Sequence, residues 1–145
     1  MKEWYECKVR YFENVDNKEK QVSAKFLVSA ISVSDAETII YAKITELLKD
    51  TNVVDSSIEI PHVNLVKYDD VDTKKLFDIY FCAKVEFIEI NENGKSQKTT
   101  CQYLTNAQSI DEALQKTNEL LSNTTIDYRI KSISETNIID IFDNE

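Results

Sequence analysis

Two segments of the sequence place an aromatic ring and cations on one side of a predicted strand. Residues 4–12 and 80–87 alternate apolar with polar residues, which is the period of a half-buried β-strand. The aromatic and cationic residues fall on the polar side, and one more lysine joins them from the next strand. These candidate ligand-binding residues are Trp4, Lys8, Arg10, Lys25, Tyr80 and Lys84. Because aromatic stacking with cations holds single-stranded nucleic acid, and also suits a nucleotide or an acidic partner, we expect an anionic ligand on these faces.

A sheet surface with ordinary cross-strand ion pairs explains the same pattern. Glu6 is placed to neutralise Lys8 and Arg10. Glu86 is placed in the same way beside Lys84. Both interpretations stay open at this point, and so does a ligand site in a groove at the junction of two copies of the repeat described below.

The residues needed for catalysis are scarce. His62 is the single histidine, so a Ser-His-Asp or Cys-His arrangement could use no other base. A zinc site would need Cys7, Cys82 and Cys101 from three separate segments, and inward-facing cysteines are more typical of packing. One glycine, Gly94, excludes a glycine-rich phosphate loop. We therefore expect no enzyme, no metal site and no cofactor.

Two acidic segments have both a functional and an ordinary interpretation. Asp69, Asp70 and Asp72 could hold a divalent cation, but they lack the glycine and distal glutamate of a calcium loop, which favours a solvated connection. The C-terminal segment 140–145 is acidic with one aromatic residue, which is typical of tails that dock partners. It also fits the end of the last predicted strand.

Composition places the chain among ordinary globular proteins. Its 145 residues suit one compact domain, and 42% hydrophobic residues can supply its core. The formal net charge of -9 opposes broad attraction to nucleic acid or to an anionic membrane, although a local basic groove remains compatible with it. No apolar run approaches a membrane-spanning length, and the N-terminus has no apolar signal region. We expect a cytoplasmic protein.

The periodicities predict a strand, strand, helix, strand unit in the first half. Strands are predicted at 4–12 and 22–28, followed by a helix from Val33 to about Lys49 that opens on a serine cap at Ser32. A third strand is predicted at 57–66, where Pro61 indicates an edge or a bulge because it cannot donate to a ladder. Residues 68–75 are read as a connection.

The second half repeats this order with similar spacing. Strands are predicted from 77 to 87 and near 99–103, with a tight primed turn at Asn93-Gly94 between them. Ser109 to Glu112 form a capping box before a helix at 110–121, and a final strand is predicted within 128–142. We therefore predict one α+β domain over 1–145, made by internal duplication with copies at 1–70 and 71–145. Its sheet would be rich in antiparallel pairs, with about six strands and two helices on one face.

Several longer motifs carry a resemblance to a known family. They are Trp4 to Tyr11, Ala83 to Val85, Ser132 to Thr136, and Ile139 to Phe142. With these motifs the chain resembles a family of small uncharacterised proteins of Bacteroidetes bacteria and their phages, known only as a domain of unknown function. It departs from the pattern at Asn137, where members carry proline. The resemblance implies a phage or mobile-element setting, and it supplies no catalytic residue.

These observations favour a non-catalytic binding protein of phage or mobile-element origin. It would occupy a protein partner or sequester a small anionic ligand such as a nucleotide. The alternative is a single-stranded DNA-binding accessory protein of phage replication, which the aromatic residues favour and the net charge opposes. A homo-oligomer is expected because exposed edge strands can pair between chains.

Overall fold

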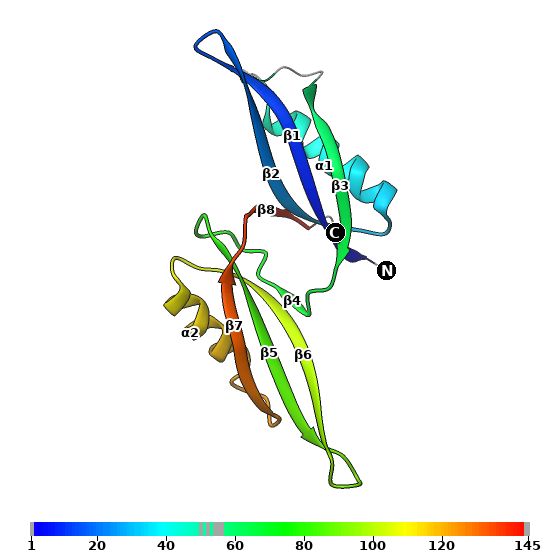
Figure 1. Cartoon of the computed structure of the whole chain (residues 1–145), viewed down its shortest axis with the longest axis vertical. Coiled ribbons are helices and arrows are strands. Elements are labelled where there is room, and N and C mark those ends of the chain that lie inside the picture. The colour runs from blue at the N-terminus through cyan, green and yellow to red at the C-terminus, as the bar shows by residue number, and fades with distance from the viewer. Residues whose placement is uncertain (1, 50, 52, 54–56, 144–145) are drawn as a thin grey trace. The chain divides into compact units, whose positions relative to one another are not determined.

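The chain folds into two compact units, which are described separately. The computed structural model describes residues 2–49, 51, 53 and 57–143 (Figure 1). The first unit combines Met1–Lys67 with Ile138–Glu145, and the second spans Tyr68–Asn137. Residues 138–145 therefore follow the second half in sequence but belong by their contacts to the first unit.

The first unit is a four-stranded sheet with one helix on one face. Strands β1 (Glu3–Val15) and β2 (Lys18–Ala30) form a long hairpin, and α1 (Val33–Leu47) leads to β3 (Glu59–Val66). The strand order is β3-β1-β2-β8, where β8 (Ile138–Phe142) runs parallel to β2 and the other pairs are antiparallel.

The second unit has the same order of elements. Strands β5 (Tyr80–Ile90) and β6 (Ser96–Asn106) form the hairpin, followed by α2 (Ile110–Leu120) and β7 (Asp127–Glu135). The order is β4-β6-β5-β7, with the short β4 (Asp70–Val71) parallel to β6. In the sequence, β4 follows β3 of the first sheet, and β8 follows β7 of the second sheet. Each sheet thus gains a short parallel strand from the segment that follows the edge strand of the other sheet.

The α+β class is confirmed, but the predicted single sheet is wrong. The structure has two mixed sheets of four strands, with one helix packed on each, instead of about six strands under two helices. The strand count was too low because β4 and β8 were not predicted. The two residues of β4 cannot show a period, and β8, Ile-Ile-Asp-Ile-Phe, does not alternate, so the pattern predicts a connection at 68–75 and a single strand within 128–142.

Alternation along the hairpin strands fixes which side chains form the core. Cys7 and Val9 are fully buried against Ala36 and Ile40 of α1. The residues between them on β1 point to the opposite face, because successive strand side chains alternate. Burial of an aliphatic side chain such as Ile40 stabilises the fold by about 1.5–3 kcal/mol.

Helix starts and irregular positions follow local chemistry. The Ser32 hydroxyl accepts from the Asp35 N–H, and the Ser109 hydroxyl accepts from the Glu112 N–H, as capping predicts. Pro61 lies in the edge strand β3, in the bulge between His62, which pairs with Lys8, and Glu59, which pairs with Arg10. The prediction that this proline marks an edge or a bulge is therefore confirmed. Within the described residues, neither helix has the length and apolar character to cross a membrane.

The turn of the second hairpin differs from the prediction. Asn93-Gly94 was expected to form a primed turn, which needs positive φ at both residues. In the described chain only Gly94 of that pair has positive φ, at 76°, and the Asn91 side chain accepts from the Asn93 and Lys95 N–H groups. The primed-type geometry instead occurs at Asp16 and Asn17, with φ of 52° and 63°.

Candidate functional site

Three basic side chains form a row across the face of the first sheet opposite α1. Lys8 on β1 is directly opposite Lys25 on β2 and opposite His62 on β3. Lys8 and His62 are exposed, and Lys25 is half-buried. The like charges of Lys8 and Lys25, which face each other across the two strands, are destabilising unless an anion or an acidic side chain compensates them.

Acidic neighbours compensate part of this row. The Lys25 Nζ lies 2.6 Å from the Glu6 Oε1, and the Arg10 Nη2 lies 2.5 Å from the Glu59 Oε2. The predicted alternative paired Glu6 with Lys8 and Arg10, and that pairing is wrong, since Glu6 reaches Lys25 on the next strand. Cross-strand ion pairs therefore exist on this face, but they leave out Lys8, for which the described residues show no ion pair.

The two candidate aromatic residues have different environments. Trp4 is half-buried on β1, two positions before Glu6 and on the same face. Tyr80 was expected on an exposed face, and this is wrong because its exposed fraction is 0%. Tyr80 therefore cannot stack on a ligand. The missed signal is the run 79–83, which is apolar throughout and therefore typical of a strand buried on both faces.

The second sheet places more cations beside Lys84 than the sequence suggested. Lys84 is exposed on β5, opposite Gln102 and Ser132. Two residues further along β5, the carboxylate of Glu86 is only 9% exposed. It lies 3.3 Å from the Arg129 Nη2 and 3.8 Å from the Lys131 Nζ. Arg129 and Lys131 were missed because a bulge opposite Lys84 and Val85 shifts the register of β7.

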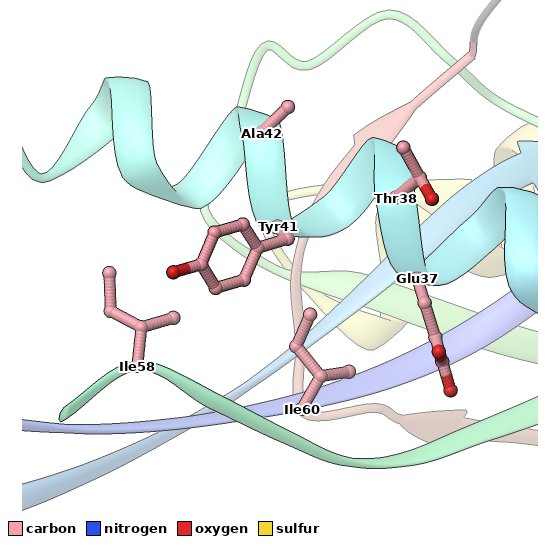
Figure 2. A pocket seen from close by; sticks show the side chains of 6 residues that line it. All are labelled: Glu37, Thr38, Tyr41, Ala42, Ile58 and Ile60. Atoms are coloured by element: carbon pink, nitrogen blue, oxygen red, sulfur yellow. The ribbon is translucent and has the colours of Figure 1, made fainter. Parts of the chain in front are cut away.

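A groove of about 580 Å³ runs between α1 and the strand β3 (Figure 2). It is lined by Glu37, Thr38, Tyr41, Ala42, Ile58 and Ile60. In Figure 2 the Tyr41 ring extends from the helix toward Ile58, and the Glu37 side chain extends toward the strand on the other side of Ile60. This groove is not evident from the sequence, because its two walls are separated in the chain and neither carries a motif.

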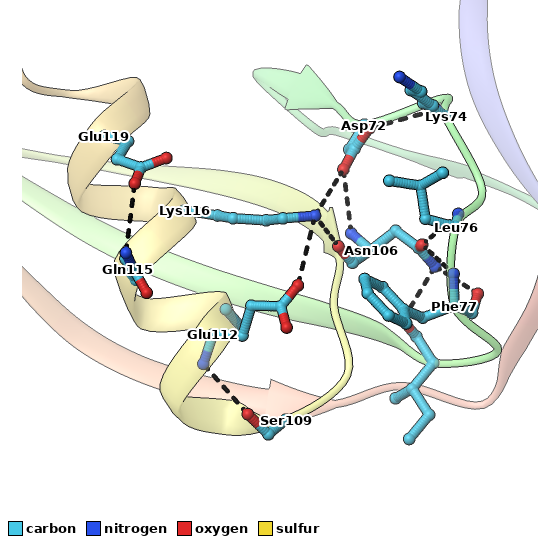
Figure 3. A network of polar contacts seen from close by, with 12 residues as sticks. Asp72, Lys74, Leu76, Phe77, Asn106, Ser109, Glu112, Gln115, Lys116 and Glu119 are labelled. Atoms are coloured by element: carbon cyan, nitrogen blue, oxygen red, sulfur yellow. Dashed lines mark hydrogen bonds and ion pairs between the residues drawn. The ribbon is translucent and has the colours of Figure 1, made fainter.

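Asn106 in the second unit has a structural role (Figure 3). Its fully buried side-chain amide accepts from the Leu76 and Phe77 N–H groups at 2.8 and 2.7 Å. It also donates to the Phe77 and Ile79 carbonyls at 2.8 and 3.1 Å. All its hydrogen-bonding capacity is used to hold 76–79 against β6, so Asn106 is not a free polar group for a ligand.

Two residues of the acidic cluster join the same structural network. The Asp72 carboxylate accepts from the Asn106 N–H at 3.3 Å, and Asp69 accepts from the Gln102 N–H at 2.8 Å. Lys116 donates to the Asn106 carbonyl at 2.6 Å and lies 4.0 Å from Asp72. Among the described residues, no group of three or more metal-ligating side chains is close enough to hold an ion.

Cys7 does not have the character of a nucleophile. Burial, followed by the nearby carboxylates of Glu37 and Glu6, raises the pKa of the Cys7 thiol from 9.0 to about 12. The thiol is therefore protonated at neutral pH, and the thiolate is the reactive form. Its predicted packing role fits its position in the core under α1.

Comparisons with known proteins give a family but no activity. A search of curated proteins found no match to the chain. A family model, by contrast, matches residues 3–144, almost the whole sequence and both units. The chain therefore belongs to the family described as a domain of unknown function (DUF4494).

Proposed function

We propose that the chain is a non-catalytic binding protein that sequesters a small anionic ligand such as a nucleotide on the sheet faces opposite the helices. The observation that carries this proposal is the row of Lys8, Lys25 and His62 across three strands of an acidic protein. Glu6 compensates Lys25, which leaves Lys8 and His62 as the groups that an anion would contact.

The second unit supports the same chemistry with a different set of side chains. Lys84, Arg129 and Lys131 are exposed, and the buried Glu86 carboxylate offsets part of their charge while holding two of them in place. Cations held in this way lose less side-chain freedom when a ligand binds, which favours affinity. An acidic surface of a protein partner would use the same contacts.

The second candidate function is that of a single-stranded DNA-binding accessory protein of phage replication. Trp4, which lies on the same face of β1 as Lys8, supports it, because a base can stack on a partly exposed indole. The burial of Tyr80 removes the aromatic platform expected in the second unit. The net charge of -9 also works against a polyanion more than against a small anion.

Internal duplication is part of the proposal. Its support is the shared order of elements and the equivalent positions of Lys8 and Lys84 on the first hairpin strands. On the resemblance of the sequence alone, we extend the proposal to a phage or mobile-element protein, and we keep the cytoplasm, which the composition favours, as its expected location. The sheet edges at β3 and β7 support a homo-oligomer, which sedimentation at several concentrations would test.

The experiment is a calorimetric titration of the intact chain with ATP at low ionic strength. We expect binding that weakens about tenfold or more when Lys8→Ala and Lys84→Ala are combined, since a charge-assisted contact is worth about 1.5–3 kcal/mol. Lys43→Ala, on the exposed surface of α1, is the matched control and should bind as the wild type does. Equal affinity of the double variant would exclude these faces as the site.

Oligo-dT added in the same assay distinguishes the DNA-binding function from the binding of a small anion. A stoichiometric complex whose affinity falls steeply with salt, without ATP binding, would replace the small-ligand proposal by the DNA-binding one.

A further inference from the structure

The groove between α1 and β3 has the size and the lining of a small-molecule site. Its volume of about 580 Å³ lies within the range that drug-sized ligands occupy. Ile58 and Ile60 form one wall, and successive turns of α1 form the other (Figure 2). Apolar walls with a few polar groups at fixed positions are the usual composition of such sites.

The polar groups of the groove define the charge of its ligand. Glu37 and Tyr41 are four residues apart on α1, so they lie on the same face of the helix. Tyr41 is 48% exposed, and Glu37 takes part in no ion pair with any residue that the structure describes. An unneutralised carboxylate beside an accessible aromatic ring attracts a cation and repels an anion.

The equivalent face of α2 carries a groove of the same volume, about 580 Å³, but its lining differs. Counting from the serine caps, Leu114 and Asn118 of α2 stand where α1 has Glu37 and Tyr41. The Tyr128 hydroxyl of β7 donates to the Asn118 side-chain oxygen at 3.1 Å, so a hydrogen bond links helix and strand there. In the first unit Tyr41 stands in place of Asn118, and Glu37 stands in place of Leu114.

We propose that the α1–β3 groove binds a small organic cation, a primary amine on an aromatic or alkyl body. The ammonium group lies between the Glu37 carboxylate and the Tyr41 ring, and the apolar body packs on Ile58 and Ile60. This site uses other residues than the proposed anion-binding faces and the opposite charge, and it stands whether or not an anion binds there.

The test is an NMR titration of the ¹⁵N-labelled chain with phenethylamine, phenethyl alcohol and 3-phenylpropionate. These probes share an aromatic body and differ in charge. We expect phenethylamine to shift the amide signals of α1 around Thr38 and Tyr41. The alcohol should bind about tenfold more weakly, as expected for losing one charge-assisted contact, and the carboxylate should not bind.

Substitutions in α1 show which side chains bind the amine. Glu37→Gln should weaken phenethylamine about tenfold, whereas Glu46→Gln, on the same helix but outside the groove, should leave it unchanged. Tyr41→Phe should keep the binding and Tyr41→Ala should reduce it, since the ring and not the hydroxyl faces the cation. Equal binding of amine and alcohol, or an unchanged Glu37→Gln variant, would overturn the proposal.

Discussion

Arg10 and Glu86 occupy the same position in two sheets of the same strand order, and each pairs with an opposite charge on the edge strand. Arg10 of β1 contacts Glu59 of β3, and Glu86 of β5 contacts Arg129 of β7. Each pair lies just beyond a bulge in the edge strand. The ion pair is thus present in both units with its charges exchanged.

We predict a small coupling energy between Arg10 and Glu59. Both side chains are substantially exposed, at 38% and 59%, so a double-mutant cycle with Arg10→Ala and Glu59→Ala should give about 0.2–1 kcal/mol. Urea unfolding of the four proteins measures it. The exchanged variant Arg10→Glu with Glu59→Arg should recover most of the stability lost by Arg10→Glu alone. No recovery would show that the pair is incidental.

Asn106→Leu should be among the most destabilising single substitutions in the second unit. It leaves the Leu76 and Phe77 N–H groups, whose hydrogen bonds to Asn106 are partly buried, without their acceptor, at up to about 1–3 kcal/mol each. Denaturant unfolding checks the loss. Asn123→Leu, at an exposed position, is the control and should stay within about 0.5 kcal/mol of the wild type. Similar losses for both would contradict the structural role of Asn106.

The parallel strand β8 should be necessary for the first unit. Ile138 is 3% exposed, so Ile138→Ala should cost about 2–5 kcal/mol. Its neighbour Ile139 is 46% exposed, and Ile139→Ala should cost much less. Thermal unfolding of both variants gives the comparison, and equal losses would exclude β8 as an integral strand.

The raised pKa of Cys7 predicts a loss of stability in alkali. The native thiol keeps its proton up to a pKa of about 12, whereas the ordinary value is 9.0, so the unfolded state loses its proton first as the pH rises. The contribution of Cys7 is therefore complete below pH 9 and declines above it, by up to about 1.4 kcal/mol per pH unit. The unfolding free energy should fall less between pH 8 and pH 10 for Cys7→Ala than for the wild type. Parallel slopes would contradict the burial of this thiol.

The long elements were predictable because each has one buried face. Cys7 and Val9 alternate with Lys8 and Arg10, and Ser32 and Ser109 mark the helix starts through hydroxyls that accept from the first turn. The parallel strands were not predictable, since two residues in β4 cannot show a period and their pairing depends on distant segments.

The candidate sites were predictable only in part. Lys8 and Lys84 lie on exposed sheet faces as expected, because alternation places them there. Tyr80 follows the same alternation but is buried, since the strand β5 begins with four buried residues and has no solvent face at that end. The Arg129 contact and the α1–β3 groove depend on register and packing across segments far apart in the sequence.

The most direct test of the anion-binding proposal is an NMR map of the ¹⁵N-labelled chain titrated with ATP. We expect the largest amide shifts around Lys8, Lys25 and His62, with a second group around Lys84, and little change along either helix. Shifts confined to α1 and α2, or none at all at high ATP concentration, would contradict binding of an anion on the sheet faces.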